Sequence, residues 1–188
     1  MRQITSRIAM ELIGHEAIVR EWYLDNAKPP RGTWSIGITN ASGHKVDRYK
    51  DNPQPITRCL EVFVWLLRSK YLPEVLRAFG GRELTETELG AALSWHWNTG
   101  AILTTSWVKL WLAGSVKSAR AFMKTHYLNN GALTPRREAE AALFFDGIWS
   151  VTGTIATVWP VKKPSYTPDW AHPQRVDIGA DLTKALVA

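Results

Sequence analysis

Residues 14–37 constrain the fold of this chain more than any other stretch. An apolar stripe at four-residue spacing begins upstream of them and predicts an amphipathic helix over residues 4–24. Two prolines and a glycine between residues 26 and 32 end the helix and force a turn. The β-prone run 33–39 then predicts a strand. We therefore expect a helix that leads through a tight turn into a small sheet.

Two carboxylates occupy unlike settings in this stretch. Glu16 continues the apolar stripe of Ile8 and Leu12, and burial beside apolar groups would keep its carboxyl neutral, as a general acid requires. Asp25 follows at the turn, where a polar setting would keep it ionised. Hydrolysis of a glycosidic bond needs such a pair of carboxyl groups, and Ser35 places a hydroxyl near them.

These residues also have plain structural interpretations. Glu16 could pair at the surface with Arg20, four residues further along the helix. Asp25 could bond the backbone amides of its own turn, as aspartates in turns often do. Thr33 and Thr39 offer hydroxyls that rival the serine between them. The residues alone leave these alternatives open.

Beyond the first strand, residues 40–43 predict a hairpin turn and residues 44–49 a return strand. From residue 52 the chain is expected to turn helical, with Pro53 and Pro55 at the helix start. An apolar stripe through residues 60–80 predicts a long helix, which Pro73 should end or kink.

Helix-start and helix-stop signals organise the second half of the chain. Thr85 and Glu88 form a capping box for the next helix, and Gly100 closes it. Further helices are expected over residues 104–112 and 115–127. Thr134 is predicted to cap a helix that runs to about residue 145. In the last part, residues 154–161 predict a strand and residues 181–187 a final helical turn or two.

Composition narrows the class of protein. The chain has 188 residues, of which 45% are hydrophobic, enough for a substantial core. Its single cysteine, Cys59, excludes an internal disulfide and suits a packing role better than a nucleophilic one. No apolar run approaches the ~20 residues that a membrane span needs, and we expect no secretion signal.

The net charge of +6 favours anionic partners, namely nucleic acid, anionic lipid or an acidic cell wall. The basic residues are scattered along the sequence, which favours a polyanionic meshwork as the partner over a DNA groove. His15, His96 and His126 lack the spacing of metal ligands.

Several motifs, taken in order, resemble those of phage-type lysozymes, the endolysins of glycoside hydrolase family 24. The family has a Glu near the end of its first helix, a Tyr-x-Asp nine residues on, and a Thr-Ile-Gly on the next strand. It also has an aromatic-Asn-x-Gly helix end and an Arg-Arg helix start. The matching residues here are His15-Glu16, Tyr23-Leu24-Asp25, Ser35-Ile36-Gly37, Trp97-Asn98-Thr99-Gly100 and Thr134-Pro135-Arg136-Arg137-Glu138.

The sequence departs from the family at three places. Ser35 stands for the usual Thr and keeps a hydroxyl. Ala17 stands for the usual Gly after the acid, and Thr39-Asn40 replaces the usual Gly-His. The last two changes concern substrate contacts and leave the expected reaction class unaltered.

The resemblance implies a mostly α, α+β fold of the lysozyme-like, two-lobe type. It would have a small β-hairpin sheet near the N-terminus, a long linking helix and a helical C-terminal lobe. The resemblance covers roughly residues 4–150, so we expect a catalytic domain at residues 1–150. Residues 151–188 would be an appendage packed on that domain.

It also implies roles for six residues. Glu16 would be the general acid, Asp25 the base that activates water, and Ser35 the holder of that water. Trp97, Ser106 and Arg137 would contact the substrate. Structural alternatives remain, because aromatic residues at helical spacing usually belong to a core, and an arginine on a helix can simply be exposed.

The implied substrate is peptidoglycan, cleaved at the β-1,4 bond between N-acetylmuramic acid and N-acetylglucosamine. Inversion is expected, with the carboxyl groups roughly 6.5–9.5 Å apart. No cofactor or metal, no nucleic acid and no stable membrane insertion are expected. The enzyme would be a monomer in the host bacterial cytoplasm and would depend on a membrane-permeabilising partner, a holin. A lytic transglycosylase, a non-catalytic wall-binding module and a basic nucleic-acid-binding protein are the alternatives.

Overall fold

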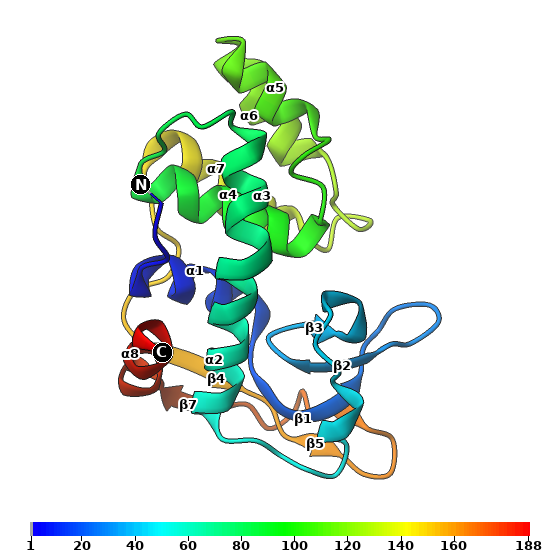
Figure 1. Ribbon diagram of the computed structural model, residues 1–188. Helices are drawn as coiled ribbons and strands as arrows, with labels where there is room; N and C mark the ends of the chain where they lie inside the picture. The colour runs from blue at the N-terminus through cyan, green and yellow to red at the C-terminus, as the bar shows by residue number, and fades with distance from the viewer. Residues whose placement is uncertain (1) are drawn as a thin grey trace. The chain divides into compact units, whose positions relative to one another are not determined.

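The computed structural model describes residues 2–188, which form two compact units (Figure 1). The helical unit comprises residues 2–12 and 67–152, and the sheet-containing unit comprises residues 13–66 and 153–188. The predicted domain boundary at residue 150 stays a prediction. No helix within residues 2–188 is both long enough and apolar enough to cross a membrane.

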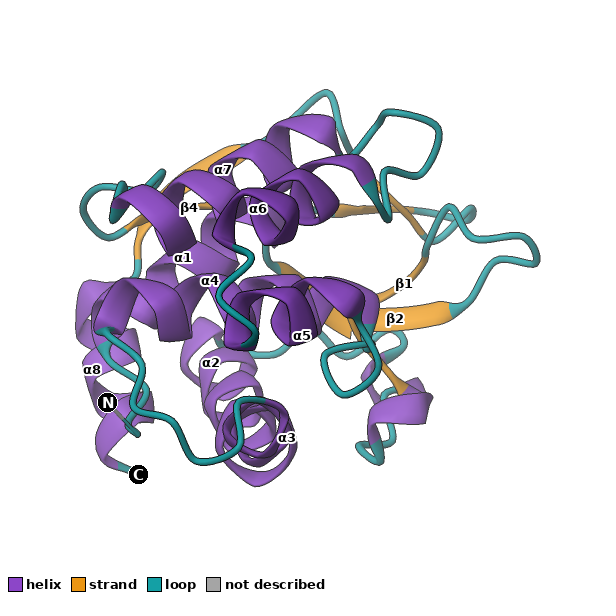
Figure 2. Ribbon diagram, turned by 90° about the horizontal axis from the view of Figure 1, so that it is seen from above, coloured by secondary structure: helices purple, strands orange, loops and turns teal. Residues whose placement is uncertain are grey.

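The helical unit is built around α4 (Glu86–Thr99) and α7 (Thr134–Asp146), which contact each other along their lengths. The pair α5 (Ser106–Leu112) and α6 (Val116–Thr125) adds to them, with α6 beside α7 (Figure 2). Trp95 and Trp107 are fully buried and meet edge to face with ring centroids 5.8 Å apart. These tryptophans lie in the core of this unit.

The ends of α4 confirm the capping predictions. The Thr85 hydroxyl accepts a hydrogen bond from the Glu88 backbone amide, and the Glu88 carboxylate accepts one from the Thr85 amide. Gly100 closes the helix in the left-handed conformation. The predicted cap of α7 is wrong, because Leu133 precedes the helix and Thr134 is its first residue, with no side-chain cap.

The sheet-containing unit holds a three-stranded antiparallel sheet in the order β1 (Val19–Leu24), β2 (Gly32–Ser35), β3 (Ile38–Thr39). The predicted strand 33–39 is therefore two strands, because Ser35 and Gly37 adopt positive φ (56° and 69°) and make the turn between them. Trp34 is fully buried and stacks on Tyr49 at 4.0 Å, which fixes β2 against the core.

The predicted return strand at 44–49 is wrong. Residues 40–49 instead form two short 3-10 turns, η1 (Asn40–Ser42) and η2 (Asp47–Tyr49). The Asn40 side chain explains this, because its Oδ1 accepts from the Val46 amide at 2.7 Å and its Nδ2 donates to Asp47 at 2.6 Å. Such side-chain bonds replace the ladder that a strand would need.

The predicted helix over residues 4–24 is also wrong in its second half. Helix α1 spans Ser6–Glu16, and β1 follows at once. Ala17 breaks the helix with a positive φ of 80°. The residues after it are β-branched or aromatic for the most part and favour a strand. The periodicity of the apolar stripe holds only as far as Glu16.

We expect Ala17→Gly to stabilise the protein. A left-handed conformation costs an L-residue about 1–2 kcal/mol, and glycine avoids this but loses more entropy on folding. The free energy of unfolding in urea should therefore rise by about 0.5–1 kcal/mol. Ala113, which ends α5 with an ordinary φ of −78°, is the matched control, and Ala113→Gly should lower stability. A loss in both variants would contradict the strain at residue 17.

The long helical segment carries an interruption near Pro73, as predicted. It consists of α2 (Ile56–Leu66), the π-helical segment η3 (Leu67–Tyr71) and α3 (Leu72–Ala78). A proline removes a backbone donor and clashes with the preceding turn, so the wider π-turn falls directly before it.

The last part of the chain belongs to the sheet-containing unit. Strand β4 (Ile155–Val158) pairs antiparallel with β7 (Gln174–Asp177), and β5 (Val161–Lys162) pairs with β6 (Thr167–Pro168). Helix α8 (Gly179–Val187) packs against α2 (Figure 1). The predicted strand 154–161 is thus shorter than expected, and the final helix starts two residues early.

Candidate active site

Glu16 is held at the C-terminal end of α1. It is the last residue of the helix and is half-buried. The Ala17 amide donates to the Ile13 carbonyl at 3.1 Å, which closes the helix just beyond the acid. The carbonyl end of a helix is the negative end of its dipole, a position that disfavours negative charge.

Asp25 is fixed in the loop between β1 and β2. Its Oδ1 accepts hydrogen bonds from the backbone amides of Ala27 (3.0 Å) and Arg31 (2.8 Å). The Asp25 amide donates in turn to the Arg31 carbonyl at 3.0 Å, so the loop is closed at its neck. Asp25 thus bonds the backbone amides of its own loop through Oδ1, which is the structural role expected of an aspartate in a turn. Its Oδ2 faces the Thr33 hydroxyl.

Tyr23 lies on β1, between the two acids in the sequence. Burial raises the pKa of the Tyr23 phenol, and the negative charges of Glu16 and Asp25 raise this pKa further. Tyr23 lies opposite Thr33 of β2, the residue whose hydroxyl reaches Asp25. The sequence interpretation missed Tyr23, although the motif contains it.

Thr33 places a hydroxyl within hydrogen-bond reach of Asp25. Its Oγ1 lies 3.4 Å from Asp25 Oδ2 and 3.2 Å from the Arg31 carbonyl, and its single proton can serve one of them at a time. Ser35, the predicted water holder, is buried like Thr33, and its Oγ donates to the Cys59 carbonyl at 3.3 Å. The Thr33 hydroxyl is thus within reach of Asp25, and the water-holding role of Ser35 stays a prediction.

Two hydroxyl deletions test the activity and the roles that the resemblance implies. On those roles, we expect Thr33→Val to lower the rate of wall lysis by about tenfold or more, because a water-orienting contact near Asp25 is lost. Ser35→Ala should leave the rate within about twofold, since that hydroxyl is occupied by Cys59. Initial lysis rates at equal enzyme concentration provide the measurement. The reverse order of effects would restore the assignment to Ser35.

The three predicted substrate contacts all lie in the helical unit. Trp97 is half-buried near the end of α4, with its ring 4.6 Å from that of Tyr71. Ser106 is exposed at the start of α5. Arg137 is fully buried in α7. Their contact with substrate stays a prediction.

Arg137 belongs to a buried polar network between α4 and α7. Its Nη2 donates to Asn98 Oδ1 at 2.7 Å, and its Nη1 forms an ion pair with Glu140 Oε2 at 3.0 Å. Arg136 bonds the other Glu140 oxygen at 3.0 Å, and Ser94 donates to that same oxygen at 2.7 Å. Two motifs far apart in the sequence are thus joined here. The sequence interpretation missed Glu140, although its spacing from the arginine pair, i to i+3 and i+4, was the available signal.

No group of three or more His, Cys, Asp or Glu side chains within residues 2–188 is arranged to hold a metal ion. The candidate site of the sheet-containing unit comprises Glu16, Asp25, Tyr23 and Thr33, and Ser35 stays a predicted member.

Comparison with solved structures identifies the fold. The crystal structure of a P22 lysozyme mutant superposes on this chain with a TM-score of 0.58, over 77% of this chain and 99% of that one. The sequence identity is 19%. No protein-family model matches the chain, and no curated protein matches it by sequence. The chain thus has the mostly helical α+β fold of a phage lysozyme, as the resemblance implied.

Proposed function

We propose that this protein is a peptidoglycan-degrading lysozyme that hydrolyses the β-1,4 bond between N-acetylmuramic acid and N-acetylglucosamine. The observation that carries the proposal is the fold of a phage lysozyme, together with two carboxylates, Glu16 and Asp25, that flank β1. One acid ends a helix and the other is bonded by backbone amides in a loop. Glycosidases need two carboxyl groups in such different settings.

In the proposed reaction, Glu16 gives its proton to the glycosidic oxygen as the bond to the sugar breaks. A water attacks the anomeric carbon from the opposite face, and Asp25 accepts a proton from it. The Asp25 oxygen that faces Thr33 is the one suited to this task, because the other already accepts two amide bonds. Solvent exchange returns both carboxyl groups to their starting states. The product has inverted configuration.

The net charge supports the substrate class. A formal charge of +6 draws the protein toward polyanions, and the bacterial wall is one. In this proposal the protein acts as an endolysin that reaches the wall from the host cytoplasm after a separate partner has permeabilised the membrane.

A turbidity assay on permeabilised Gram-negative cells tests the function. The purified protein should clear the suspension and release soluble wall fragments, and a heat-inactivated sample should do neither. Binding to the wall without any release of fragments would indicate a non-catalytic wall-binding module and would overturn the proposal.

A further inference from the structure

Strand β1 is the connection between the two acids of the proposed site. Glu16 lies two residues before Ile18, and Asp25 directly follows Leu24 at the end of the strand. One side of β1 pairs with β2, where Val19 lies opposite Ser35 and Leu24 opposite Gly32. Any change in the position of either end of β1 therefore changes the spacing of the two carboxyl groups.

A segment from the far end of the sequence bonds β1 at both of these ends. We name residues 157–166 the C-terminal brace. Near Glu16, the Ile18 amide donates to the Thr157 carbonyl at 2.9 Å, and the Trp159 amide donates to the Ile18 carbonyl at 2.9 Å. Near Asp25, the Leu24 amide donates to the Tyr166 carbonyl at 2.7 Å. The brace thus spans the strand that separates the acids.

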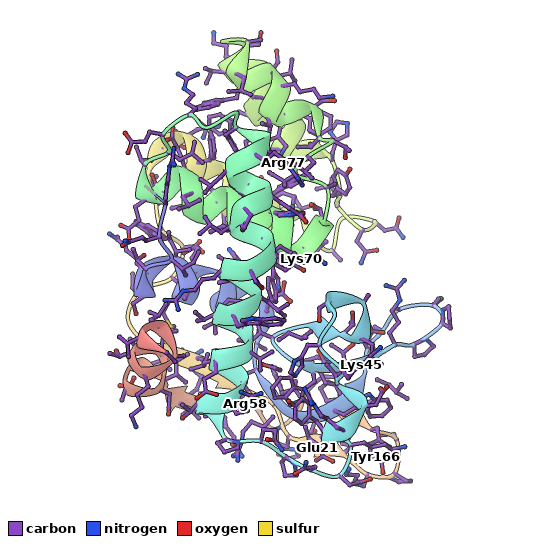
Figure 3. All side chains as sticks on the ribbon, viewed as in Figure 1. Glu21, Lys45, Arg58, Lys70, Arg77 and Tyr166 are labelled. Atoms are coloured by element: carbon purple, nitrogen blue, oxygen red, sulfur yellow. The ribbon has the colours of Figure 1, made fainter. Side chains whose placement is uncertain are left out.

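Lys163 connects the brace to β1 and to residue Asp51 through ion pairs. Its ammonium bonds the carboxylates of Glu21, on β1, and of Asp51. The Asp51 amide also donates to Glu21 Oε1 at 3.0 Å, so three segments meet at one point. Glu21 and Tyr166 are labelled at this point in Figure 3.

Tyr166 adds a second attachment. Its hydroxyl donates to Asp51 Oδ2 at 2.8 Å, and its ring meets the Trp22 ring edge to face at 5.6 Å. Tyr166 adopts a positive φ of 55°, a conformation that costs a residue with a side chain energy. The contacts with Asp51 and Trp22 hold it there, with its carbonyl directed at Leu24.

The brace is anchored on both sides. At its start, the brace shares residues 157 and 158 with β4, which pairs with β7, and Thr154, just before β4, donates to Asp177 at 2.7 Å. After β7, α8 packs on α2, where the Thr57 hydroxyl donates to Asp181. Because both ends of the brace are bonded to other elements, the brace can restrict the position of β1.

We propose that the C-terminal brace sets the spacing of Glu16 and Asp25, with Lys163 and Tyr166 as positioning residues. This inference rests on the proposed function, since it concerns the same two acids. The brace lies beyond residue 150, where the resemblance to phage lysozymes ends. Spacing matters because an inverting glycosidase needs room for a water between its carboxyl groups. A displacement of about 1 Å can cost about 10²-fold in rate.

The test compares two neighbouring lysines. Lys163→Met removes the bonds to Glu21 and Asp51, whereas Lys162→Met removes an ion pair with Asp169, which does not lie on β1. We expect Lys163→Met to lower kcat on purified peptidoglycan about tenfold, with KM and the thermal midpoint close to wild type and a shifted pH–rate profile. Lys163→Arg should restore most of kcat, and Lys162→Met should match wild type. Equal kcat values for Lys163→Met and Lys162→Met would overturn the proposal.

A second readout does not depend on activity. Amide hydrogen exchange at Leu24 and Ile18 should be faster in Lys163→Met than in Lys162→Met, because the brace no longer holds the strand. Unchanged exchange at both amides overturns the brace even in a protein without lytic activity. Inactivity of the wild type with faster exchange in Lys163→Met would instead overturn the proposed function and leave the brace supported.

Discussion

Glu16→Gln is expected to abolish wall lysis while leaving the fold intact. Glutamine keeps the shape and the hydrogen-bonding capacity of the side chain but carries no proton of suitable acidity. General acid–base catalysis typically contributes 10²–10⁴-fold, so the rate should fall by at least about 10³-fold. Lysis rate and thermal midpoint, measured on the same preparation, test this.

Glu61→Gln is the matched control for this variant. Glu61 lies on α2 in the same unit and forms only an exposed pair with Arg58. Exposed pairs contribute little to stability, so this variant should keep both full activity and the wild-type midpoint. Full wall-degrading activity in Glu16→Gln would refute the assignment of the acid.

Asp25→Asn should also lose most of the activity, by about 10²-fold or more, because the amide cannot take a proton from water. The loop should survive this change. An asparagine oxygen can still accept from the amides of Ala27 and Arg31, which are the bonds that close the loop. The rate should therefore fall without loss of stability, as judged by urea unfolding.

Asp47→Asn controls for loss of a carboxylate near the same sheet. Asp47 accepts from the Trp22 indole at 3.2 Å and from Asn40 at 2.6 Å, and it is exposed. The Asp47→Asn variant should retain the lytic activity of the wild type. If Asp25→Asn retains activity as well, Asp25 is not the base, and a mechanism with one acid becomes the better account.

The sequence predicted the elements whose signals are local. The capping box at Thr85 and Glu88, the stop at Gly100 and the interruption at Pro73 all depend on a few neighbouring residues, and the structure confirms them. The mostly helical α+β fold with a small N-terminal sheet was also predicted.

The errors have non-local causes. The apolar stripe was extended past Glu16 because periodicity does not register a left-handed turn at Ala17. The role of Ser35 stays a prediction, because its place in the motif does not reveal that its hydroxyl bonds the Cys59 carbonyl or that the Thr33 hydroxyl reaches Asp25. Backbone conformation of this kind depends on the folded sheet.

The C-terminal brace could not be predicted for a related reason. The strand signal at residues 154–161 was recognised, but its partner was not. The contact with β1 joins residues more than a hundred positions apart, and a strand signal carries no information about which edge the strand will bond. The ion pairs of Lys163 depend entirely on that contact.

The chemistry of the released fragments tests the central claim most directly, namely that two carboxyl groups act together on water. Purified peptidoglycan is digested with the wild-type protein, and the soluble fragments are analysed by mass spectrometry. Two-carboxylate hydrolysis predicts muramic acid ends that carry the added water and a free reducing group. Anhydro-muramic ends, lighter by one water, would show that no water enters the reaction and would contradict the account.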